Sequence, residues 1–256
     1  MKNNFLRIGF GLAIVIAVVV LLTAGFLKKP AKEPVKPAGK GFVVIELFTS
    51  EGCSSCPQAD VEVEKISVLH PEDVYVLGFH VDYWDRLGWK DEYSDAAYSE
   101  RQRRYAEHFN LSSVYTPQVV VNGKKQLVGS NATGLNKSVV TEISHTTNQA
   151  IELSAIGSGG KTVQVTYKIT PPANSAINIA LIQIAAQTRV KGGENEGRTL
   201  RHINIVRDFK TINSPGKTGT ATIALPNDIT AKECKVIVYL QQHTREVTGV
   251  AVAFIK

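Results

Sequence analysis

Two cysteines separated by two residues constrain this chain more than any other feature. Cys53 and Cys56 follow an apolar run at 42–48 and precede an amphipathic run that reaches residue 69. A strand, a turn and a helix therefore place Cys53 at or just before a helix N-terminus. Free backbone N–H groups and the positive end of the helix dipole favour a thiolate there. The spacing allows the two sulfurs to form a disulfide and is typical of a redox-active dithiol.

The cysteine pair has three interpretations, of which the redox-active dithiol is favoured. The second is a structural disulfide. The third is metal binding, for which Cu(I) suits two thiolates better than Zn²⁺ does. Zinc takes about four ligands, and the sequence contains no second Cys-x-x-Cys and no His-x₃-His pattern. We therefore predict neither a bound metal nor another cofactor.

A dithiol mechanism assigns different roles to the residues around the pair. Cys53, nearer the helix N-terminus, is expected to be the exposed nucleophile, and Cys56 the resolving thiol. Glu46, in the preceding strand, is a candidate proton acceptor for Cys56, since buried carboxylates are rare unless paired or functional. The alternative is a glutamate on the face of the strand with no such role. Cys234 lies in an apolar strand and is predicted to be a buried, inert thiol.

The N-terminus predicts export. Residues 8–27 carry no charge and are almost entirely apolar, which is long enough to span a bilayer as a helix. We interpret 1–27 as a signal anchor or a signal peptide and the Lys- and Pro-rich stretch 28–41 as an extended linker. The expected location is therefore membrane-anchored through the N-terminal helix, with the bulk in the periplasm or outside the cell. A cleaved, secreted form is the alternative.

Length and charge limit the remaining classes. A chain of 256 residues with 43% hydrophobic residues can build two domains with proper cores. The net charge of +6 comes partly from lysines of the linker. No basic patch interleaved with aromatic residues is present, so we predict no nucleic-acid binding.

The pattern from 42 to 148 predicts an α/β domain of the order β-α-β-α-β-β-α. Its expected elements are strand 42–48, a helix to about 69, strand 74–80, a helix at 91–109, strands 118–121 and 124–128, and a final helix that includes Leu135, Val139 and Ile143. Asn-Gly at 122–123 is a strong hairpin signal.

This order, with the cysteine pair after the first strand and Thr116-Pro117 before the third, resembles the thioredoxin fold. The resemblance covers about 41–147. It implies that Pro117 is a cis-proline beside the cysteine pair and that the backbone of Thr116 offers strand-like contacts to a substrate peptide. Gly52 and the two serines between the cysteines depart from ordinary thioredoxins, so the resemblance implies no redox potential.

At a finer level, 46–56 and 80–84 resemble an exported bacterial family, domain of unknown function 1223, which implies no particular chemistry. The second segment follows a strand, and ligands of open α/β sheets bind at the carboxyl ends of strands. We therefore predict a substrate-binding group there and beside Thr116; a purely structural loop is the alternative. Its members are His80, Asp82, Tyr83, Trp84 and Tyr115.

The remainder, 149–256, predicts a β-sandwich domain. Seven short alternating runs separated by Gly, Pro and Asn are typical of antiparallel sheets. A polar loop at 192–198 joins two of these strands. Such a loop is typically a solvated hairpin, and the alternative is that it folds over the first domain and shapes a substrate groove.

Together these features favour a thiol–disulfide oxidoreductase that acts through Cys53 and Cys56 on the thiols or disulfides of exported proteins or peptides. Two alternatives remain open. One is a non-catalytic binding module with a structural disulfide, and the other is a Cu(I)-binding protein of thioredoxin-like fold.

Overall fold

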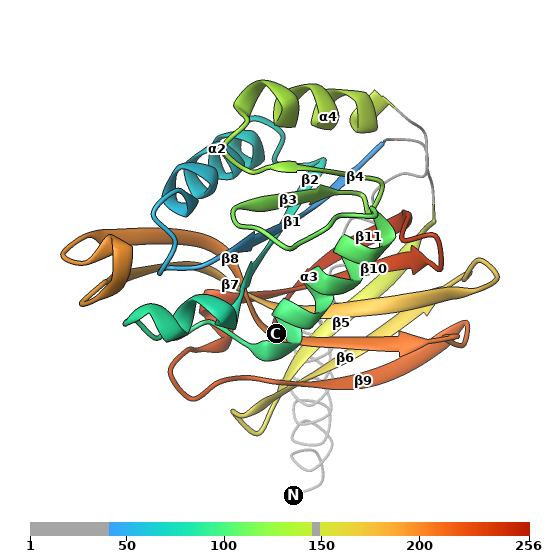
Figure 1. Cartoon of the computed structure of the whole chain (residues 1–256). Helices are drawn as coiled ribbons and strands as arrows, with labels where there is room; N and C mark the ends of the chain where they lie inside the picture. The colour runs from blue at the N-terminus through green and yellow to red at the C-terminus, as the bar shows by residue number, and fades with distance from the viewer. Residues whose placement is uncertain (1–40, 145–148) are drawn as a thin grey trace, which may run out of the picture. The chain divides into compact units, whose positions relative to one another are not determined.

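The computed structural model describes residues 41–144 and 149–256 (Figure 1). The predicted anchor at 1–27 and nearly all of the linker at 28–41 lie outside the described residues. Within the part that is described, no helix is long and apolar enough to cross a membrane.

The first part of the chain forms the expected α/β order. Its elements are β1 (Val43–Thr49), α2 (Cys56–Leu69), β2 (Val74–His80), the short 3₁₀ helix η2 (Asp82–Leu87), α3 (Ala96–His108), β3 (Gln118–Val121), β4 (Lys125–Val128) and α4 (Ala132–Ser144). The helix predicted from residue 91 begins later, because Asp95 caps it by accepting a hydrogen bond from the Ala97 amide at 2.7 Å.

The second part consists of strands and two short 3₁₀ helices. Its elements are β5 (Ile151–Ser158), β6 (Thr162–Ile169), β7 (Ser175–Arg189), η3 (Gly193–Asn195), β8 (Thr199–Asn213), β9 (Thr218–Ala224), η4 (Ala231–Glu233), β10 (Cys234–Gln242) and β11 (Val247–Phe254). All seven predicted strands are therefore present.

The two parts share one large sheet, which differs from a simple division at residue 148. Its strand order is β11-β10-β7-β8-β2-β1-β3-β4, and β5-β6-β9 form a separate sheet. The parts meet where β2 pairs in parallel with β8, at Gly78 and Ile205. Without β8, β2 would be an edge strand with unpaired backbone groups. The described chain from 41 onward belongs to one compact unit.

Three apolar cores hold this arrangement together. Helices α2 and α4 cover one face of the β1–β3 region, and α3 lies on the other. The core under α3 includes Ile237 and Tyr239 of β10, so the second part of the chain helps to bury the first. The small sheet packs on β7 and β10 through the third core. Sandwich packing is thus present, but four of the seven strands belong to the large sheet.

The Asn-Gly hairpin between β3 and β4 is confirmed. Asn122 and Gly123 have φ angles of 46° and 67°, the left-handed values that tight hairpin turns require. A Cβ on Gly123 would lie 1.8 Å from the carbonyl oxygen of Arg245. This turn therefore requires glycine both for its backbone conformation and for its approach to the loop before β11.

Candidate functional site

The predicted disulfide is present at the start of α2. The sulfurs of Cys53 and Cys56 are 2.13 Å apart and their Cα atoms 5.4 Å apart. Cys56 is the first residue of α2, whereas Cys53 lies in the preceding turn, where its amide donates to the carbonyl of Ser50 at 3.2 Å. The strand-turn-helix prediction for the motif is therefore confirmed.

The expected exposure of Cys53 is not found in this disulfide form. Both cysteines are only 1% exposed. The exposed part of the turn is Ser54 and Ser55, which lie between them. The Ser55 hydroxyl is 3.5 Å from the sulfur of Cys53. A partner can therefore touch the turn at its serines, but it reaches the sulfurs only if a neighbouring group moves.

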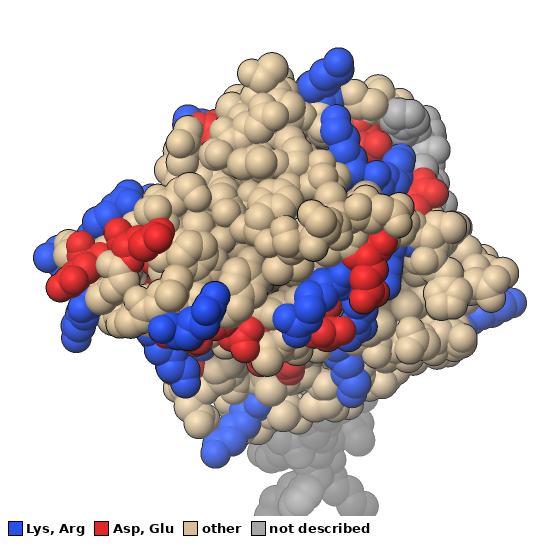
Figure 2. Space-filling model, in the orientation of Figure 1, with Lys and Arg blue, Asp and Glu red and all other residues tan. Residues whose placement is uncertain are grey.

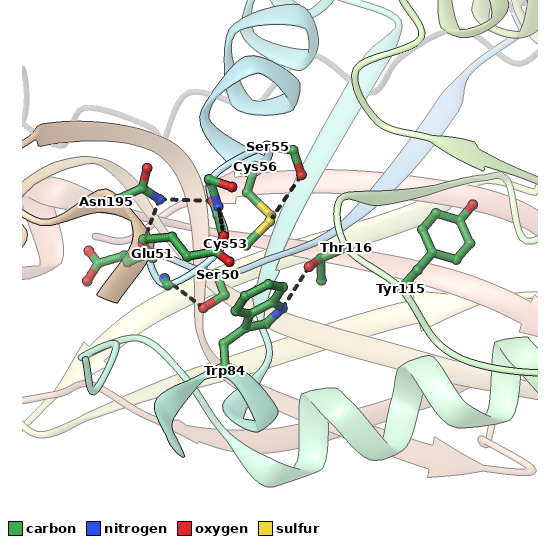
Figure 3. Close-up of a disulfide and its surroundings, with 12 residues drawn as sticks. Ser50, Glu51, Cys53, Ser55, Cys56, Trp84, Tyr115, Thr116 and Asn195 are labelled. Atoms are coloured by element: carbon green, nitrogen blue, oxygen red, sulfur yellow. Dashed lines mark hydrogen bonds between the residues drawn. A yellow bond between two sulfur atoms is a disulfide. The ribbon is translucent and has the colours of Figure 1, made fainter. Parts of the chain in front are cut away.

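Trp84 of η2 lies beside the cysteine turn (Figure 3). Its indole N–H donates to the Thr116 hydroxyl at 2.8 Å. A Cβ on Gly52 would lie 3.2 Å from the Cβ of Trp84, so the absence of a side chain at Gly52 lets η2 approach the cysteine turn closely. The Thr116–Pro117 peptide bond is cis, as expected. Trp84 thus links the cysteine turn to the Thr116 loop.

The loop at 192–198 contacts the cysteine turn on the side away from Thr116 (Figure 3), which corrects its interpretation as a solvated hairpin. Asn195 is fully buried. Its amide donates to the carbonyls of Glu51 at 2.8 Å and of Cys53 at 2.9 Å (Figure 3). Glu194 accepts a hydrogen bond from the backbone N–H of Ser54 at 3.0 Å. The second part of the chain therefore fixes the backbone of the motif.

The 192–198 loop is in close backbone contact with the segment just after η2. A Cβ on Gly192 would lie 2.5 Å from the carbonyl oxygen of Gly88, just after η2. The next residue, Gly193, adopts a φ of 73°, which glycine tolerates best. The loop and the end of η2 therefore approach each other as closely as the absence of side chains allows.

Two of the other predicted substrate-binding residues, His80 and Asp82, are held by hydrogen bonds to neighbouring side chains. His80 is 1% exposed, and its Nδ1 lies 2.6 Å from the carboxylate of Asp91, so it lies beneath the site rather than on its surface. Asp82 accepts a hydrogen bond from the hydroxyl of Ser99 at 2.5 Å.

The two tyrosines of that predicted group are partly exposed and bound to glutamines. The Tyr83 hydroxyl donates to Gln102 at 3.1 Å, and burial raises the pKa of Tyr83 to about 12. Tyr115 donates to Gln126. The structure therefore brings Trp84 and Thr116 directly to the cysteine turn, while Tyr83 and Tyr115 lie on the elements that carry them.

Glu46 is not placed beside Cys56. Side chains alternate along β1, and Glu46 points to the α3 face whereas α2 packs on the other. There Arg101 holds both carboxylate oxygens at 2.5 and 2.9 Å, and Tyr105 donates at 2.7 Å. The expected role of Glu46 as a proton acceptor for Cys56 is corrected accordingly, because β1 separates the two residues.

A different set of buried ionisable residues lies behind the motif, and sequence reasoning did not select it. Glu51 receives a hydrogen bond from the indole of Trp89 at 2.7 Å, and its Oε1 lies 3.3 Å from Nε2 of His202. The other ring nitrogen of His202 lies 3.4 Å from the carboxylate of Asp60. His202 is 2% exposed and Glu51 is fully buried.

Asp91 connects this cluster to the backbone of the motif. Its carboxylate accepts hydrogen bonds from the amide of Glu51 at 2.8 Å and from that of Tyr93 at 2.9 Å. Burial opposes ionisation of Asp91, but the charge of His80 and these hydrogen bonds outweigh burial and lower the pKa of Asp91. Asp91 thus remains a carboxylate that positions the cysteine turn.

One signal in the sequence marks part of this cluster. Asp60 lies on the inner side of α2, in a row with Cys56, Ala59 and Val63, where an apolar residue is normal. His202 likewise occupies an inward position of β8. Within 41–144 and 149–256, no group of three or more His, Cys, Asp or Glu residues has an arrangement that could hold a metal ion.

Fold and site together define a class of protein: a mixed α/β protein with a Cys-x-x-Cys disulfide at a helix start, covered by a loop from its β-rich half. A family model described as protein of unknown function (DUF1223) matches residues 44–241. The chain therefore belongs to that family.

A solved structure is similar over most of its length. It is the X-ray crystal structure of a structural-genomics target from Agrobacterium tumefaciens, with a TM-score of 0.63 and 27% sequence identity, covering 85% of this chain and 95% of that one. A comparison with curated proteins found no match.

Proposed function

We propose that this protein is an exported thiol–disulfide oxidoreductase in which residues 42–148 form a thioredoxin-like domain. One observation carries the proposal: the Cys53–Cys56 disulfide closes the turn from β1 into α2, with the Thr116 loop beside it. The N-terminus of α2 can stabilise the thiolate of a cysteine in such a turn. The order of elements from β1 to α4 supports the thioredoxin-like part.

Exchange would proceed through a mixed disulfide. In the reduced protein, the Cys53 thiolate attacks a partner disulfide and releases one partner thiolate. The Cys56 thiolate then attacks the sulfur of Cys53 and releases the second, so that the partner is reduced and the Cys53–Cys56 disulfide forms again. The reverse sequence oxidises a partner dithiol. Both directions require a neighbouring group to shift, since both cysteines are only 1% exposed.

Polypeptides are the proposed partners. Trp84 and Thr116 lie beside the cysteine turn and Tyr115 lies beyond Thr116 (Figure 3), and aromatic residues are enriched at protein interfaces. Figure 2 shows that the surface between α3 and α4 on this side of the molecule carries few charged side chains. A weakly charged surface of this kind suits a peptide segment better than a charged small molecule.

The apolar stretch 8–27 supports a membrane anchor, followed by the linker at 28–41. In this proposal the anchor holds the folded part on the outer side of the membrane, in the periplasm or outside the cell. A disulfide persists in such a compartment, whereas the cytosol would keep the thiols reduced.

A binding module with a structural disulfide is the second candidate, and the burial of the cysteines favours it. Both are 1% exposed, and Asn195 fixes the carbonyl of Cys53. Such a disulfide would brace the start of α2 and take no part in exchange.

The deciding experiment combines a redox equilibrium with covalent trapping. In glutathione buffers, we expect a midpoint potential above about −300 mV; a much lower value favours the structural candidate. Cys56→Ser should trap polypeptides on Cys53 in the exported compartment, identifiable by mass spectrometry. Cys53→Ser is the matched control, since it keeps one cysteine of the pair but removes the nucleophile. Equal recovery from both variants would contradict the proposal.

A further inference from the structure

The cysteine pair has a buried carboxylate one helical turn away. Cys56 and Asp60 are four residues apart on α2 and both face the interior. Side chains at this spacing are neighbours, with Cβ atoms about 5–6 Å apart. Asp60 is therefore the carboxyl group that α2 itself presents beside Cys56.

His202 joins this carboxylate to a second one. Its two ring nitrogens lie 3.4 Å from Asp60 and 3.3 Å from Glu51. Among the described residues, neither of these nitrogens nor the Oε1 of Glu51 has a hydrogen-bond partner. Buried polar groups in folded proteins are nearly always paired, so an unpaired set calls for a functional explanation.

The remaining groups around His202 have other partners. His80 stacks edge-on against it with ring centroids 4.9 Å apart, but its Nδ1 is already held by Asp91 at 2.6 Å. The Tyr93 ring is 6.0 Å away, and its hydroxyl lies 3.5 Å from Thr188. Burial raises the pKa of Tyr93 to about 12, so it stays neutral at physiological pH. Proton exchange by His202 is therefore directed to Asp60 and Glu51.

We propose that Asp60 and His202 form the proton-exchange site of the Cys53–Cys56 couple, with Asp60 acting at Cys56 and His202 storing the proton. This inference rests on the proposed function. His202 belongs to the β-rich part of the chain. It acts on Cys56 only through Asp60 and is therefore a positioning residue.

Opening of the disulfide is coupled to transfer of one proton. A partner thiolate attacks the Cys53 sulfur, the S–S bond breaks, and its electron pair stays on Cys56. The proton held between Asp60 and His202 then moves to the Cys56 sulfur. In the return step, Asp60 takes this proton back, the Cys56 thiolate attacks the Cys53 sulfur, and the partner leaves as a thiolate.

Repulsion between negative charges explains why a thiolate that forms on Cys56 has to be protonated. A new thiolate on Cys56 would lie in a buried region that already contains the carboxylates of Asp60 and Glu51, and like charges at short range are costly there. Burial disfavours a protonated His202, but the close approach of Asp60 and Glu51 outweighs burial and raises the pKa of His202 to about 10. His202 thus holds a proton at neutral pH, and this proton is available to the thiolate that forms on Cys56.

The test follows opening of the disulfide by dithiothreitol in the purified full-length chain, from pH 6 to 11. Rates are divided by the thiolate fraction of the reductant. We expect the wild-type rate to be flat at neutral pH and to fall as pH passes about 10. Asp60→Asn and His202→Gln should react about a hundredfold more slowly at pH 7, the lower end of what general acid catalysis contributes, and should lose this pH dependence. Asp60→Glu should restore it.

Glu46→Gln is the matched control, because it removes a buried carboxylate from the other face of β1. Its pH profile should follow that of the wild type even if it is less stable. A profile altered in Glu46→Gln and unchanged in Asp60→Asn would overturn the inference. As a measure independent of folding defects in variants, the NMR signals of the His202 ring in the wild type should shift on reduction; unchanged signals would contradict the inference.

The two proposals fail differently. If the wild-type disulfide resists thiols and Cys56→Ser traps no polypeptide, the proposed function fails. If exchange and trapping occur but the Asp60 and His202 variants keep the wild-type pH profile, only the proton-exchange site is wrong.

Discussion

Two buried ionic clusters connect the halves of this protein, and they differ in how well their atoms are paired. Under α3, Glu46 binds the guanidinium of Arg101 through two hydrogen bonds at 2.5 and 2.9 Å. Behind the disulfide, His202 approaches Glu51 and Asp60 at 3.3 and 3.4 Å without forming a hydrogen bond to either. Both clusters are almost fully buried.

This difference supports a structural role for the Glu46 cluster and is the basis of the chemical role proposed for the His202 cluster. The Glu46 cluster also receives the hydroxyls of Tyr105 and Tyr239, at 2.7 and 3.3 Å, so that its charges are compensated and the geometry is fixed. Fully satisfied buried networks rigidify a core, whereas incompletely paired ones are costly. The incomplete pairing beside the disulfide supports the proton exchange proposed for the His202 cluster.

The largest effect is expected from Arg101→Met. It leaves Glu46 as a buried charge without its main partner, and breaking a buried ion pair from one side costs about 3–5 kcal/mol. The free energy of unfolding, measured with urea, should fall by this amount, while the redox potential of the folded protein stays unchanged.

The double variant Arg101→Met with Glu46→Gln sharpens this test. Removing both charges should recover much of the loss, because no isolated charge is left. If the double variant is as unstable as the single one, the pair is not the source of the stability.

The next effect is expected at the loop that covers the disulfide. Asn195→Ala removes two hydrogen bonds to the carbonyls of Glu51 and Cys53 and leaves both acceptors buried, which costs roughly 2–3 kcal/mol. Dithiothreitol should then reduce the disulfide faster than in the wild type. Glu194→Gln is the control: it keeps an acceptor for the Ser54 amide and lies on the exposed side of the loop, so its rate should stay near that of the wild type. Slower reduction of Asn195→Ala would contradict the covering role.

Sequence patterns predicted the elements that depend on interactions between residues close to one another in the chain. The position of the disulfide follows from a strand, a turn and a helix around Cys53 and Cys56, and the seven later strands follow from alternation. The hairpin at Asn122-Gly123 follows from its turn residues. Each of these depends on contacts within a few residues, which a single sequence displays.

The contacts between distant segments could not be predicted in this way. Nothing in Gly78 or Ile205 identifies the other as its strand partner, and the amide of Asn195 binds backbone carbonyls that carry no sequence signal. Glu46 appeared suited to Cys56 by proximity in sequence, but the alternation of β1 puts it on the opposite face. Asp60 was detectable as a carboxylate on the buried side of α2.

The smallest effect, taken per pH unit, is a pH dependence that distinguishes the His202 cluster from the Glu46 cluster. The pKa of His202 is raised to about 10 in the folded protein from 6.5. Its contribution to stability is therefore fully present below about pH 6.5 and is lost as pH rises through about 10. In this window the free energy of unfolding should fall by up to about 1.4 kcal/mol per pH unit.

Urea unfolding of the oxidised protein between pH 6.5 and 9 measures this slope. The range stops at pH 9 because Cys234, whose pKa burial raises to about 11 from 9.0, adds a slope of the same sign at higher pH. His202→Gln should remove the slope, and its stability should approach that of the wild type as pH rises. Glu46→Gln should lower stability by a similar amount at every pH in this range, since arginine stays charged throughout. A slope that persists in His202→Gln would mean that the proton resides elsewhere and that the two buried clusters are alike.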